Sequence, residues 1–356
     1  MSLLQKPFQI GSVTLPNRVV LAPLTRMRAF EGRAPGDLQV TYYRQRASAG
    51  LMLTEATSIS PMGVGYPNTP GIWSAEQIAG WKRVNDAVHA HGGHTCVQLW
   101  HVGRISDPEL LDGQLPVAPS AIAPEGQVAV LRPKRDYVVP RALETAEVAG
   151  IVQDFVQAAR NAKEAGFDFI EVHAANGYLF DQFLHEGSNQ RTDQYGGSIE
   201  NRARFLMETL DALLTVWPAE RIGVHLNPMS NTHSVHDSNP QALFTYVAAQ
   251  IQARKLGFIF SREELKDGVL PIGQHMRKVY TGAFIANDGF TAEQAQAVIA
   301  SGAADAVAFG RVYMANPDLP ERLAQGAALN ALDFNTIYSP DATGYTDYPT
   351  LASSAA

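Results

Sequence analysis

The sequence has a single cysteine, Cys96, in 356 residues, so the chain cannot form an internal disulfide. A protein without disulfides suits a reducing compartment, and we expect it to be cytoplasmic. Cys96 lies in the apolar run HTCVQLW. In such a run, packing within a strand is a better expectation for a thiol than nucleophilic chemistry.

An excess of basic residues, a long apolar run and a secretory signal are also missing. The 28 Lys and Arg residues are outnumbered by 35 Asp and Glu residues, which gives a formal net charge of −7. This charge balance does not indicate the basic surface that binds nucleic acid or an anionic membrane. No run of about 18 apolar residues is present to cross a membrane. The opening MSLLQKPFQIGSV lacks the basic and apolar regions of a secretory signal. We expect neither nucleic acid nor a membrane as a partner.

Eight short apolar or β-branched runs, bounded by turn residues, are expected to form strands. Amphipathic segments between them, such as 74–92, 145–166 and 291–303, begin at Ser or Thr with an early Glu. These are helix start signals. Strand and helix repeated eight times predicts an α/β protein with a single (β/α)₈ TIM barrel. An open doubly wound sheet is the alternative, but no G-x-G-x-x-G follows the first strand. The expected strands are 17–24, 50–56, 94–100, 167–173, 221–227, 257–261, 282–287 and 305–310.

Three segments lie outside this repeat, within a single domain that covers residues 1–356. Residues 7–16 are expected to form a β-hairpin that turns at Gly11-Ser12 and closes the base of the barrel. Residues 103–141, rich in Pro and Gly, are too long for an ordinary loop after the third strand, so we expect a lid over the site. The tail 350–356 is expected to fray.

Polar residues gather where the strands end, which is where TIM barrels carry their active sites. Gly310 and Arg311 follow the eighth strand and Gly289 follows the seventh, which predicts a phosphate cradle. Pairing of Arg311 with an acidic neighbour is the alternative. Thr25 and Gln98 end neighbouring strands and suit a flat heterocycle with amide-like edges. Each side chain can instead form a hydrogen bond with a nearby backbone group. Clustered histidines at 89–94 lack the partners of a metal site, and we expect no metal.

Short stretches along nearly the whole chain resemble the Old Yellow Enzyme family of FMN-dependent ene-reductases. Within the family, they are most similar to the bacterial xenobiotic, N-ethylmaleimide and morphinone reductases. The matching stretches are LPNRVVLAPLTR at 15–26, ASAGLMLTEAT at 47–57, GYPNTPGIW at 65–73, VQLWHVGR at 97–104, HAANGYLFDQFL at 173–184, NQRTDQYGGSIENRARF at 189–205, DAVAFGR at 305–311, ANPDLPERL at 315–323 and GYTDYP at 344–349.

The resemblance implies a tightly bound, non-covalent FMN that NADPH or NADH reduces. Thr25 would donate a hydrogen bond to the flavin C4 carbonyl and tune the electronics of the cofactor. The Gln98 amide would bond the pyrimidine edge, and backbone atoms would line the ring. The implied cofactor-binding residues are Pro23, Leu24, Thr25, Ala56, Gln98, His225, Asp288, Gly289, Gly310 and Arg311.

The resemblance also implies a reaction, in which an activated C=C bond of an α,β-unsaturated carbonyl or nitro compound is reduced. His173 and Asn176 would bond one substrate oxygen, and flavin N5 would deliver hydride to the β-carbon. Tyr178 would then protonate the α-carbon. Tyr66, Trp100 and Tyr345 would shape the substrate wall. Nitrate esters and nitroaromatics are further candidate acceptors, and the enzyme is expected to be a monomer or a homodimer.

One position departs from the family pattern. Many members have an arginine in the fifth strand where this chain has His225. A neutral histidine would not stabilise the reduced anionic flavin as a permanent charge does, so we expect a flavin potential that is lower or depends more on pH.

Other interpretations remain open from the residues alone. His173, Asn176 and Tyr178 can instead have structural roles. Asn176 would cap a helix, His173 would be a hydrogen-bonded residue at a strand end, and Tyr178 would pack in the interior. A flavin-free lyase or isomerase of sugar phosphates would need a base such as Glu171. A ligand-binding carrier on the same scaffold is a third possibility, and it predicts bound flavin without turnover.

Overall fold

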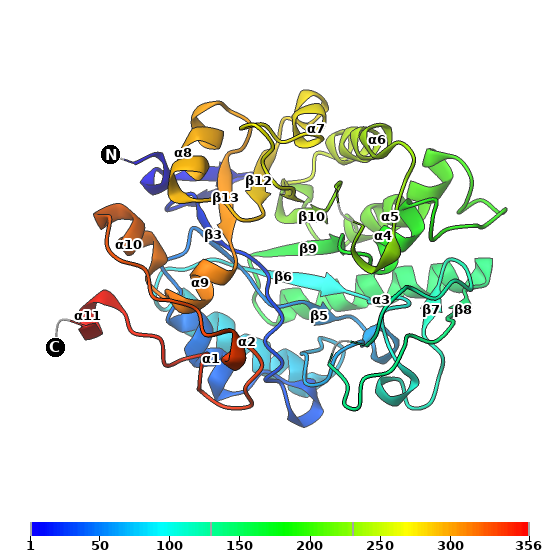
Figure 1. Ribbon diagram of the computed structural model, residues 1–356, viewed down its shortest axis with the longest axis horizontal. Helices are drawn as coiled ribbons and strands as arrows, with labels where there is room; N and C mark the ends of the chain where they lie inside the picture. The colour runs from blue at the N-terminus through cyan, green and yellow to red at the C-terminus, as the bar shows by residue number, and fades with distance from the viewer. Residues whose placement is uncertain (1, 129, 230, 355–356) are drawn as a thin grey trace.

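The computed structural model describes residues 2–128, 130–229 and 231–354. Within them, parallel strands form a closed ring that helices surround (Figure 1). A pairing between the second and third barrel strands closes the ring, with Met52 opposite Thr95. The predicted TIM barrel is confirmed. Its strands are β3 (Val19–Leu21), β4 (Leu51–Leu53), β6 (Thr95–Trp100), β9 (Phe169–Ala174), β10 (Ile222–Leu226), β11 (Phe258–Arg262), β12 (Ala283–Asn287) and β13 (Ala306–Phe309), and β5 (Thr57–Ser58) extends the sheet beside β6.

The helices begin and end where their capping residues require. The Ser74 hydroxyl accepts a hydrogen bond from Gln77 N, and the Thr291 hydroxyl accepts one from Gln294 N. After α3, Gly166 has a φ of +85°, which ends the helix in a conformation that glycine adopts without strain. The helices are α1 (Asp37–Arg44), α2 (Ala75–His89), α3 (Thr145–Glu164), α4 (Leu179–Leu184), α5 (Ile199–Leu213), α6 (Pro240–Ala253), α7 (Gly273–Val279), α8 (Ala292–Ala300), α9 (Arg311–Ala315), α10 (Leu319–Gln325) and α11 (Leu351–Ser354).

The barrel separates two apolar cores, because alternate strand residues point inward and outward. The inner core contains Cys96, which is buried as predicted, together with Phe258 and Phe260 of β11. The hairpin of β1 (Phe8–Ile10) and β2 (Val13–Leu15) contributes Phe8, Ile10 and Leu15 to this core. The hairpin therefore closes one end of the barrel, and the other end is left for the site.

The segment 103–141 lies against the loop that follows β10. Arg104 Nη2 donates to the carbonyl oxygen of His233 over 2.9 Å, and the Tyr137 ring packs edge-on against the His233 ring. The segment contains β7 (Val117–Ala118), which pairs with β8 (Arg141–Ala142). Ala129, which falls in the predicted lid, lies outside the described residues. These contacts place the segment beside the barrel mouth, and its role as a lid stays a prediction.

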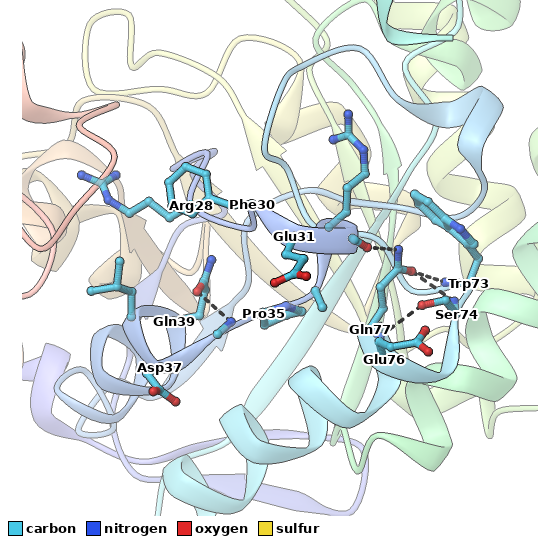
Figure 2. A pocket seen from close by; sticks show the side chains of 15 residues that line it. Arg28, Phe30, Glu31, Pro35, Asp37, Gln39, Trp73, Ser74, Glu76 and Gln77 are labelled. Carbon is cyan, nitrogen blue, oxygen red and sulfur yellow. Dashed lines mark hydrogen bonds between the residues drawn. The ribbon is translucent and has the colours of Figure 1, made fainter. Parts of the chain in front are cut away.

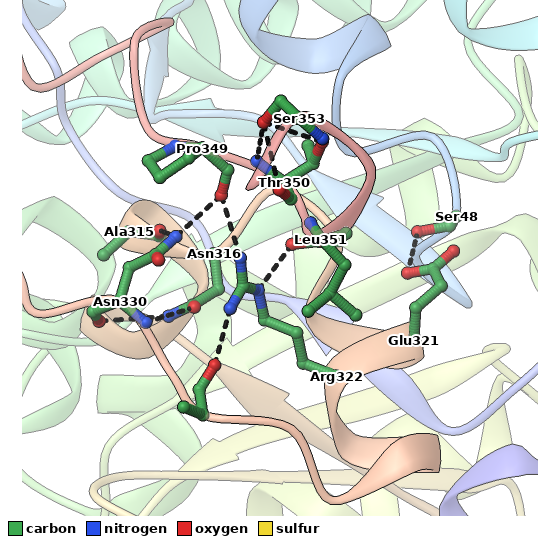
Figure 3. Close-up of polar contacts among 12 residues, drawn as sticks. Ser48, Ala315, Asn316, Glu321, Arg322, Asn330, Pro349, Thr350, Leu351 and Ser353 are labelled. Carbon is green, nitrogen blue, oxygen red and sulfur yellow. Dashed lines mark hydrogen bonds and ion pairs between the residues drawn. The ribbon is translucent and has the colours of Figure 1, made fainter. Parts of the chain in front are cut away.

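The C-terminal segment is bonded to the start of α10 at Pro349 and Leu351, and fraying of the rest of residues 350–356 stays a prediction. Leu351 N donates to the Asp318 carboxylate over 2.6 Å and so starts α11. Arg322 Nη2 donates to the carbonyl oxygen of Pro349 over 2.9 Å (Figure 3). These bonds satisfy backbone groups that a frayed tail would leave to water. Residues 355–356 lie outside the described residues.

None of the helices in the described ranges combines the length and the apolar character that crossing a bilayer requires.

Candidate active site at the mouth of the barrel

A cavity of about 470 Å³ opens at the carboxyl ends of the barrel strands. We call it the mouth cavity. Residues that follow β3, β12 and β13 form one side of it, and His225 and Arg262 reach it from β10 and β11. Its lining residues are Ala22, Pro23, Leu24, Asn176, His225, Arg262, Asn287, Asp288, Gly289, Phe290, Ala308, Phe309, Gly310, Arg311 and Val312.

Two histidine rings stack at this cavity because their strands pair in register. His173 of β9 lies opposite His225 of β10, so both side chains leave the sheet on the same face. The ring centroids are 5.0 Å apart and the planes are inclined by 6°. Burial lowers the pKa of His173 well below its ordinary value and that of His225 to about 3. Both imidazoles are therefore neutral at physiological pH.

A hydrogen-bonded chain below these rings decides which nitrogen of His225 carries the proton. Gln98 Nε2 donates to Glu171 Oε2 over 2.6 Å and lies 2.9 Å from His225 Nδ1. With the Gln98 amide in this orientation its nitrogen donates, so His225 Nδ1 accepts and the proton of the neutral ring is on Nε2. Nε2 is buried and has no hydrogen-bond partner in the described part of the chain. His225 therefore presents an unused donor.

Glu171 is a neutral acid at the bottom of this chain. Its side chain is fully buried, and burial raises its pKa to about 8. Because the acid is uncharged, it needs no counter-ion. Both amide hydrogens of Gln98 are directed to protein groups, which leaves only its carbonyl oxygen for a ligand.

The turn after β9 carries Asn176 and Tyr178 into the site. Asn176 has a φ of +59° and Gly177 a φ of +75°, and asparagine and glycine tolerate this left-handed region best. A Cβ atom on Gly177 would collide with the carbonyl oxygen of Thr232. The close approach of that loop therefore requires glycine, and the turn directs the next side chain, Tyr178, inward.

The Tyr178 ring stands edge-on to two rings of the site. Its centroid lies 5.0 Å from that of Trp100 and 5.0 Å from that of His173. The Tyr178 hydroxyl is 3.0 Å from the Tyr66 hydroxyl, and the Tyr66 ring stacks on Trp100. Burial raises the pKa of Tyr178 well above its ordinary value, so the phenol keeps its proton.

The far end of the mouth cavity is rich in groups that suit an anion. Gly289 has a φ of +75°, Gly310 precedes α9, and the exposed Arg311 begins that helix. In the described residues Arg311 forms no ion pair, and its guanidinium lies 5.6 Å from the centre of the Phe334 ring. The alternative, in which Arg311 only pairs with an acidic neighbour, therefore has no such neighbour within the described residues.

Comparison with known proteins assigns the family. The sequence profile of the NADH:flavin oxidoreductase / NADH oxidase family matches residues 3–330. The chain belongs to this family. It is a flavin oxidoreductase of the Old Yellow Enzyme type, as its resemblance indicated.

Relatives and solved structures agree with this assignment. Putative 12-oxophytodienoate reductase 2 of Oryza sativa subsp. japonica is 44% identical, and the match covers 97% of this chain and 93% of the relative. The structure of morphinone reductase superposes with a TM-score of 0.94 at 48% identity, covering 99% of this chain and 97% of that one. The Old Yellow Enzyme homologue from Zymomonas mobilis has a TM-score of 0.95 at 40% identity, covering 98% of this chain and 99% of that one.

Family membership implies FMN as the cofactor, and the mouth cavity suits it. An isoalloxazine ring needs apolar walls and polar partners at its edges, and a phosphate needs backbone amides and cations. The cavity has apolar walls in Leu24, Phe290 and Phe309 and an exposed cation in Arg311, beside Gly289 and Gly310. The unused N–H of His225 is the kind of buried donor that a bound ligand satisfies.

Most of the residues predicted for the site lie at or next to the mouth cavity. Thr25 follows the lining residue Leu24 and is half-buried. Ala56 packs in a cluster with Trp100. Tyr345 is the exception, because it is fully buried and stacks on Tyr42 at a centroid distance of 4.2 Å. The structure thus places Tyr345 in a cluster with buried arginines, 4.3 Å from the Arg28 guanidinium, and not at the cavity.

Sequence reasoning missed three residues that surround Asn176. Asn227 Nδ2 and Arg262 Nη1 both donate to Asn176 Oδ1, over 2.7 and 2.9 Å. His233 Nδ1 lies 2.8 Å from the carbonyl oxygen of Asn176. A signal existed for Arg262, because it directly follows Ser261, where the sixth strand was predicted to end, and β11 runs one residue further to include it.

A larger cavity lies elsewhere. About 1020 Å³ in volume, it is lined by residues of the stretch 28–39 and of 73–77 (Figure 2). We call it the outer cavity. Gln77 Oε1 accepts from Trp73 N and Ser74 N, and Gln77 Nε2 donates to the carbonyl oxygen of Gly32. Its polar groups are largely bonded to one another, so volume alone does not identify the active site.

Proposed function

We propose that the protein uses NADPH or NADH to reduce the activated C=C bond of α,β-unsaturated carbonyl or nitro compounds. One observation carries this proposal. The His173 and Tyr178 rings lie 5.0 Å apart, and Asn176, from the turn between them, lines a cavity that suits a flavin. Reduced FMN, when bound, would supply the hydride. Nitrate esters and nitroaromatics remain candidate acceptors.

The chain would hold the cofactor with the groups that its fold leaves unused. Gln98 would accept from the pyrimidine edge through its remaining carbonyl oxygen, and His225 would donate from Nε2. Thr25 would donate to the C4 carbonyl. Pro23, Leu24 and Ala56 would line the ring with backbone atoms, while Gly289, Gly310 and Arg311, with Asp288 beside them, would surround the phosphate.

His173 and Asn176 would bind the oxygen of the acceptor. A neutral imidazole N–H and an amide N–H both donate, and neither carries a charge that needs neutralising. As negative charge develops on the acceptor oxygen, these fixed donors gain strength without reorganising. Removing one donor of this kind typically costs a factor of about 10²–10³ in rate.

Tyr178 would supply the proton to the α-carbon. Its raised pKa keeps the hydroxyl protonated, and Tyr66 can pass a proton to it across the 3.0 Å contact between their oxygens. Trp100 and Tyr66 hold the ring of Tyr178 and would form the substrate wall.

The nicotinamide would use the same cavity before the acceptor does. Morphinone reductase has been solved in complex with tetrahydroNAD, and that chain is 50% identical with a TM-score of 0.93. A shared cavity requires an ordered exchange, in which the oxidised nicotinamide leaves before the acceptor binds.

The rival interpretations find less support. A sugar-phosphate lyase needs an ionised base, and Glu171 has a raised pKa and accepts from Gln98. The carrier interpretation predicts a bound flavin that NAD(P)H and acceptors leave unchanged.

The testing experiment is an anaerobic absorbance titration of the purified protein, first with NADPH and then with 2-cyclohexenone. We expect visible flavin bands that bleach with NADPH and return with the enone. Bands that do not return with any enone or nitroalkene would contradict the proposal. A protein without flavin bands, even after added FMN, would contradict the cofactor assignment.

A further inference from the structure

Arg262 is the cationic residue nearest to the proposed substrate-binding donors, and the function described above gives it no role. It ends β11, and its guanidinium donates through Nη1 to Asn176 Oδ1 over 2.9 Å. We propose that Arg262 is a positioning residue that directs the N–H groups of Asn176 toward the acceptor and supplies the fixed positive charge beside it. This inference rests on the proposed function.

The fold brings Arg262 to this position through strand alternation. Phe258 and Phe260 of β11 point into the barrel interior. Side chains two residues apart share a face of a strand, so Arg262 also points inward, one level nearer to the mouth. It therefore lines the mouth cavity, and its side chain is 38% exposed.

The argument for orientation depends on the symmetry of a carboxamide. An asparagine amide can turn by 180° with little change in shape, so its neighbours decide which end faces them. Asn227 cannot decide this for Asn176, because its own amide can turn as well and present an acceptor in place of a donor. Two such amides can bond in either of two arrangements.

Arginine removes this ambiguity because its guanidinium has donors and no acceptor. An Asn176 amide nitrogen facing Arg262 would set donor against donor. The oxygen must therefore face Arg262, and Asn227 follows by presenting its own Nδ2 over 2.7 Å. With Oδ1 occupied by both neighbours, the hydrogens of Asn176 Nδ2 remain for a ligand.

The argument for charge depends on the surroundings of the acceptor. His173 and His225 are neutral, and burial and then the charge of Arg262 lower the pKa of His225. Asp288 faces Arg262 at 3.6 Å, and both side chains are partly exposed, so water screens the pair. The charge of Arg262 beside the donors favours negative charge on a bound oxygen.

The experiment uses FMN-loaded protein and two readouts. The first is the rate at which 2-cyclohexenone reoxidises the reduced enzyme. The second is binding of 4-nitrophenol, whose ionised form absorbs visible light and whose anionic oxygen stands in for the charged acceptor oxygen. This second readout does not depend on turnover, so failure of the proposed function and failure of the present inference give different results.

Arg262→Met removes both the charge and the donor. We expect reoxidation at least about tenfold slower and 4-nitrophenolate binding at least about tenfold weaker, with a raised pKa of the bound phenol. Asn227→Ala keeps Arg262, so reoxidation should stay within about threefold of wild type. Arg254→Gln, at the C-terminal end of α6 and paired with Asp211, is the matched control for a changed net charge.

A double-mutant cycle separates orientation from charge. If Arg262 acts through Asn176, the effect of Arg262→Met on reoxidation shrinks when it is combined with Asn176→Ala. Unchanged reoxidation and phenolate binding in FMN-loaded Arg262→Met would overturn the inference. An Asn227→Ala loss equal to that of Arg262→Met would overturn the orienting role.

Arg262→Lys covers the case in which Arg262→Met does not retain FMN. Lysine also donates without accepting, so 4-nitrophenolate binding should stay within about threefold of wild type. Loss of that binding in FMN-loaded Arg262→Lys would contradict the role of the charge.

Discussion

The mouth cavity and the outer cavity differ in how their polar groups are satisfied. The outer cavity is the larger, at about 1020 Å³ against about 470 Å³. In it, Arg33 Nη1 donates to the carbonyl oxygens of Tyr66 and Thr69, and Gln77 bonds three backbone groups. Gln39 Nε2 is the buried lining atom that lacks a partner in the described part of the chain.

At the mouth cavity the unpaired donor is on a ring with a proposed ligand contact. His225 Nε2, which lines the cavity, is buried without a partner in the described residues, as are His173 Nδ1 and Trp100 Nε1 of neighbouring strand ends. Burial also shifts the pKa of His173, His225 and Tyr178 toward their neutral forms. Because leaving a buried polar group unpaired costs about 1–3 kcal/mol, such a concentration indicates a ligand site. The position at the strand ends together with these unpaired donors, and not volume, locates the site.

The sharpest test of this comparison is Tyr178→Phe. Loss of the proton donor should slow reoxidation by 2-cyclohexenone by a factor of about 10²–10⁴. Reduction by NADPH should change little, since that step needs no proton from Tyr178. Stopped-flow absorbance separates the two half-reactions. Tyr195→Phe, which removes a hydroxyl bonded to Glu208, is the control. Reoxidation at the wild-type rate would exclude Tyr178 as the donor.

Glu171→Gln tests whether the buried Glu171 below the histidine rings is neutral. The folded state holds a proton on Glu171 up to pH of about 8, whereas the unfolded chain releases it near the ordinary pKa of 4.5. Folding stability therefore falls as pH rises through this window, because the folded state binds more protons there.

Glutamine does not titrate. The free energy of unfolding of Glu171→Gln, taken relative to that of wild type, should therefore be roughly 1–3 kcal/mol higher at pH 8.5 than at pH 5. Urea unfolding at both pH values measures this. The exposed Glu164→Gln should show no such gain. Equal stability differences at the two pH values would mean that Glu171 is ionised in the folded protein.

His225→Arg tests the electrostatic departure from the family pattern. The pKa of His225 is lowered to about 3, so His225 should not titrate in the holoenzyme between pH 6 and 8. Of the two expectations from the sequence, a lower potential and a stronger pH dependence, this favours the first. An arginine at position 225 adds a charge and should raise the flavin midpoint potential by about 30 mV or more.

The midpoint potential is measured by spectroelectrochemical titration. Glu171→Gln in the same chain prevents an arginine at position 225 from ionising Glu171, which lies 3.7 Å from His225 Nδ1. A potential equal to that of wild type in this double variant would contradict the expectation.

The smallest effect is expected at the outer cavity. Phe30 lines it and is 46% exposed. Phe30→Ala should leave kcat/KM for 2-cyclohexenone within about twofold of wild type, as surface changes away from special features usually do. A tenfold loss measured by steady-state assay would give the outer cavity a catalytic role and weaken the contrast between the two cavities.

The fold was largely predictable from the sequence. Apolar strands, capped helices and glycine ends are local signals, and the hairpin turn at Gly11-Ser12 needed only its own residues. The approximate location of the site followed as well, because the strand ends of a parallel barrel meet at one mouth. That rule alone groups His173, Asn176, Tyr178 and His225.

The details of the site were less accessible. Tyr345 lies in a motif shared with the family, but its ring is stacked in the interior and is not at the cavity. Arg262 contacts Asn176 across 86 positions of the chain, and Tyr66 contacts Tyr178 across 112. No local pattern encodes contacts over such separations.

The sequence by itself determined the barrel, because strand and helix periodicities act over a few residues and a repeat of eight closes in one way. It also determined that His173, Asn176, Tyr178 and His225 gather at the mouth, but not that Arg262 joins them or that Tyr345 is absent. Only the tertiary structure decided their chemical state. Closing the ring buries Glu171 and His225 far from water, which makes both neutral, and it brings Arg262 to the amide of Asn176. Protonation and hydrogen-bond direction depend on the whole surroundings of a group, and those exist only once the chain has folded.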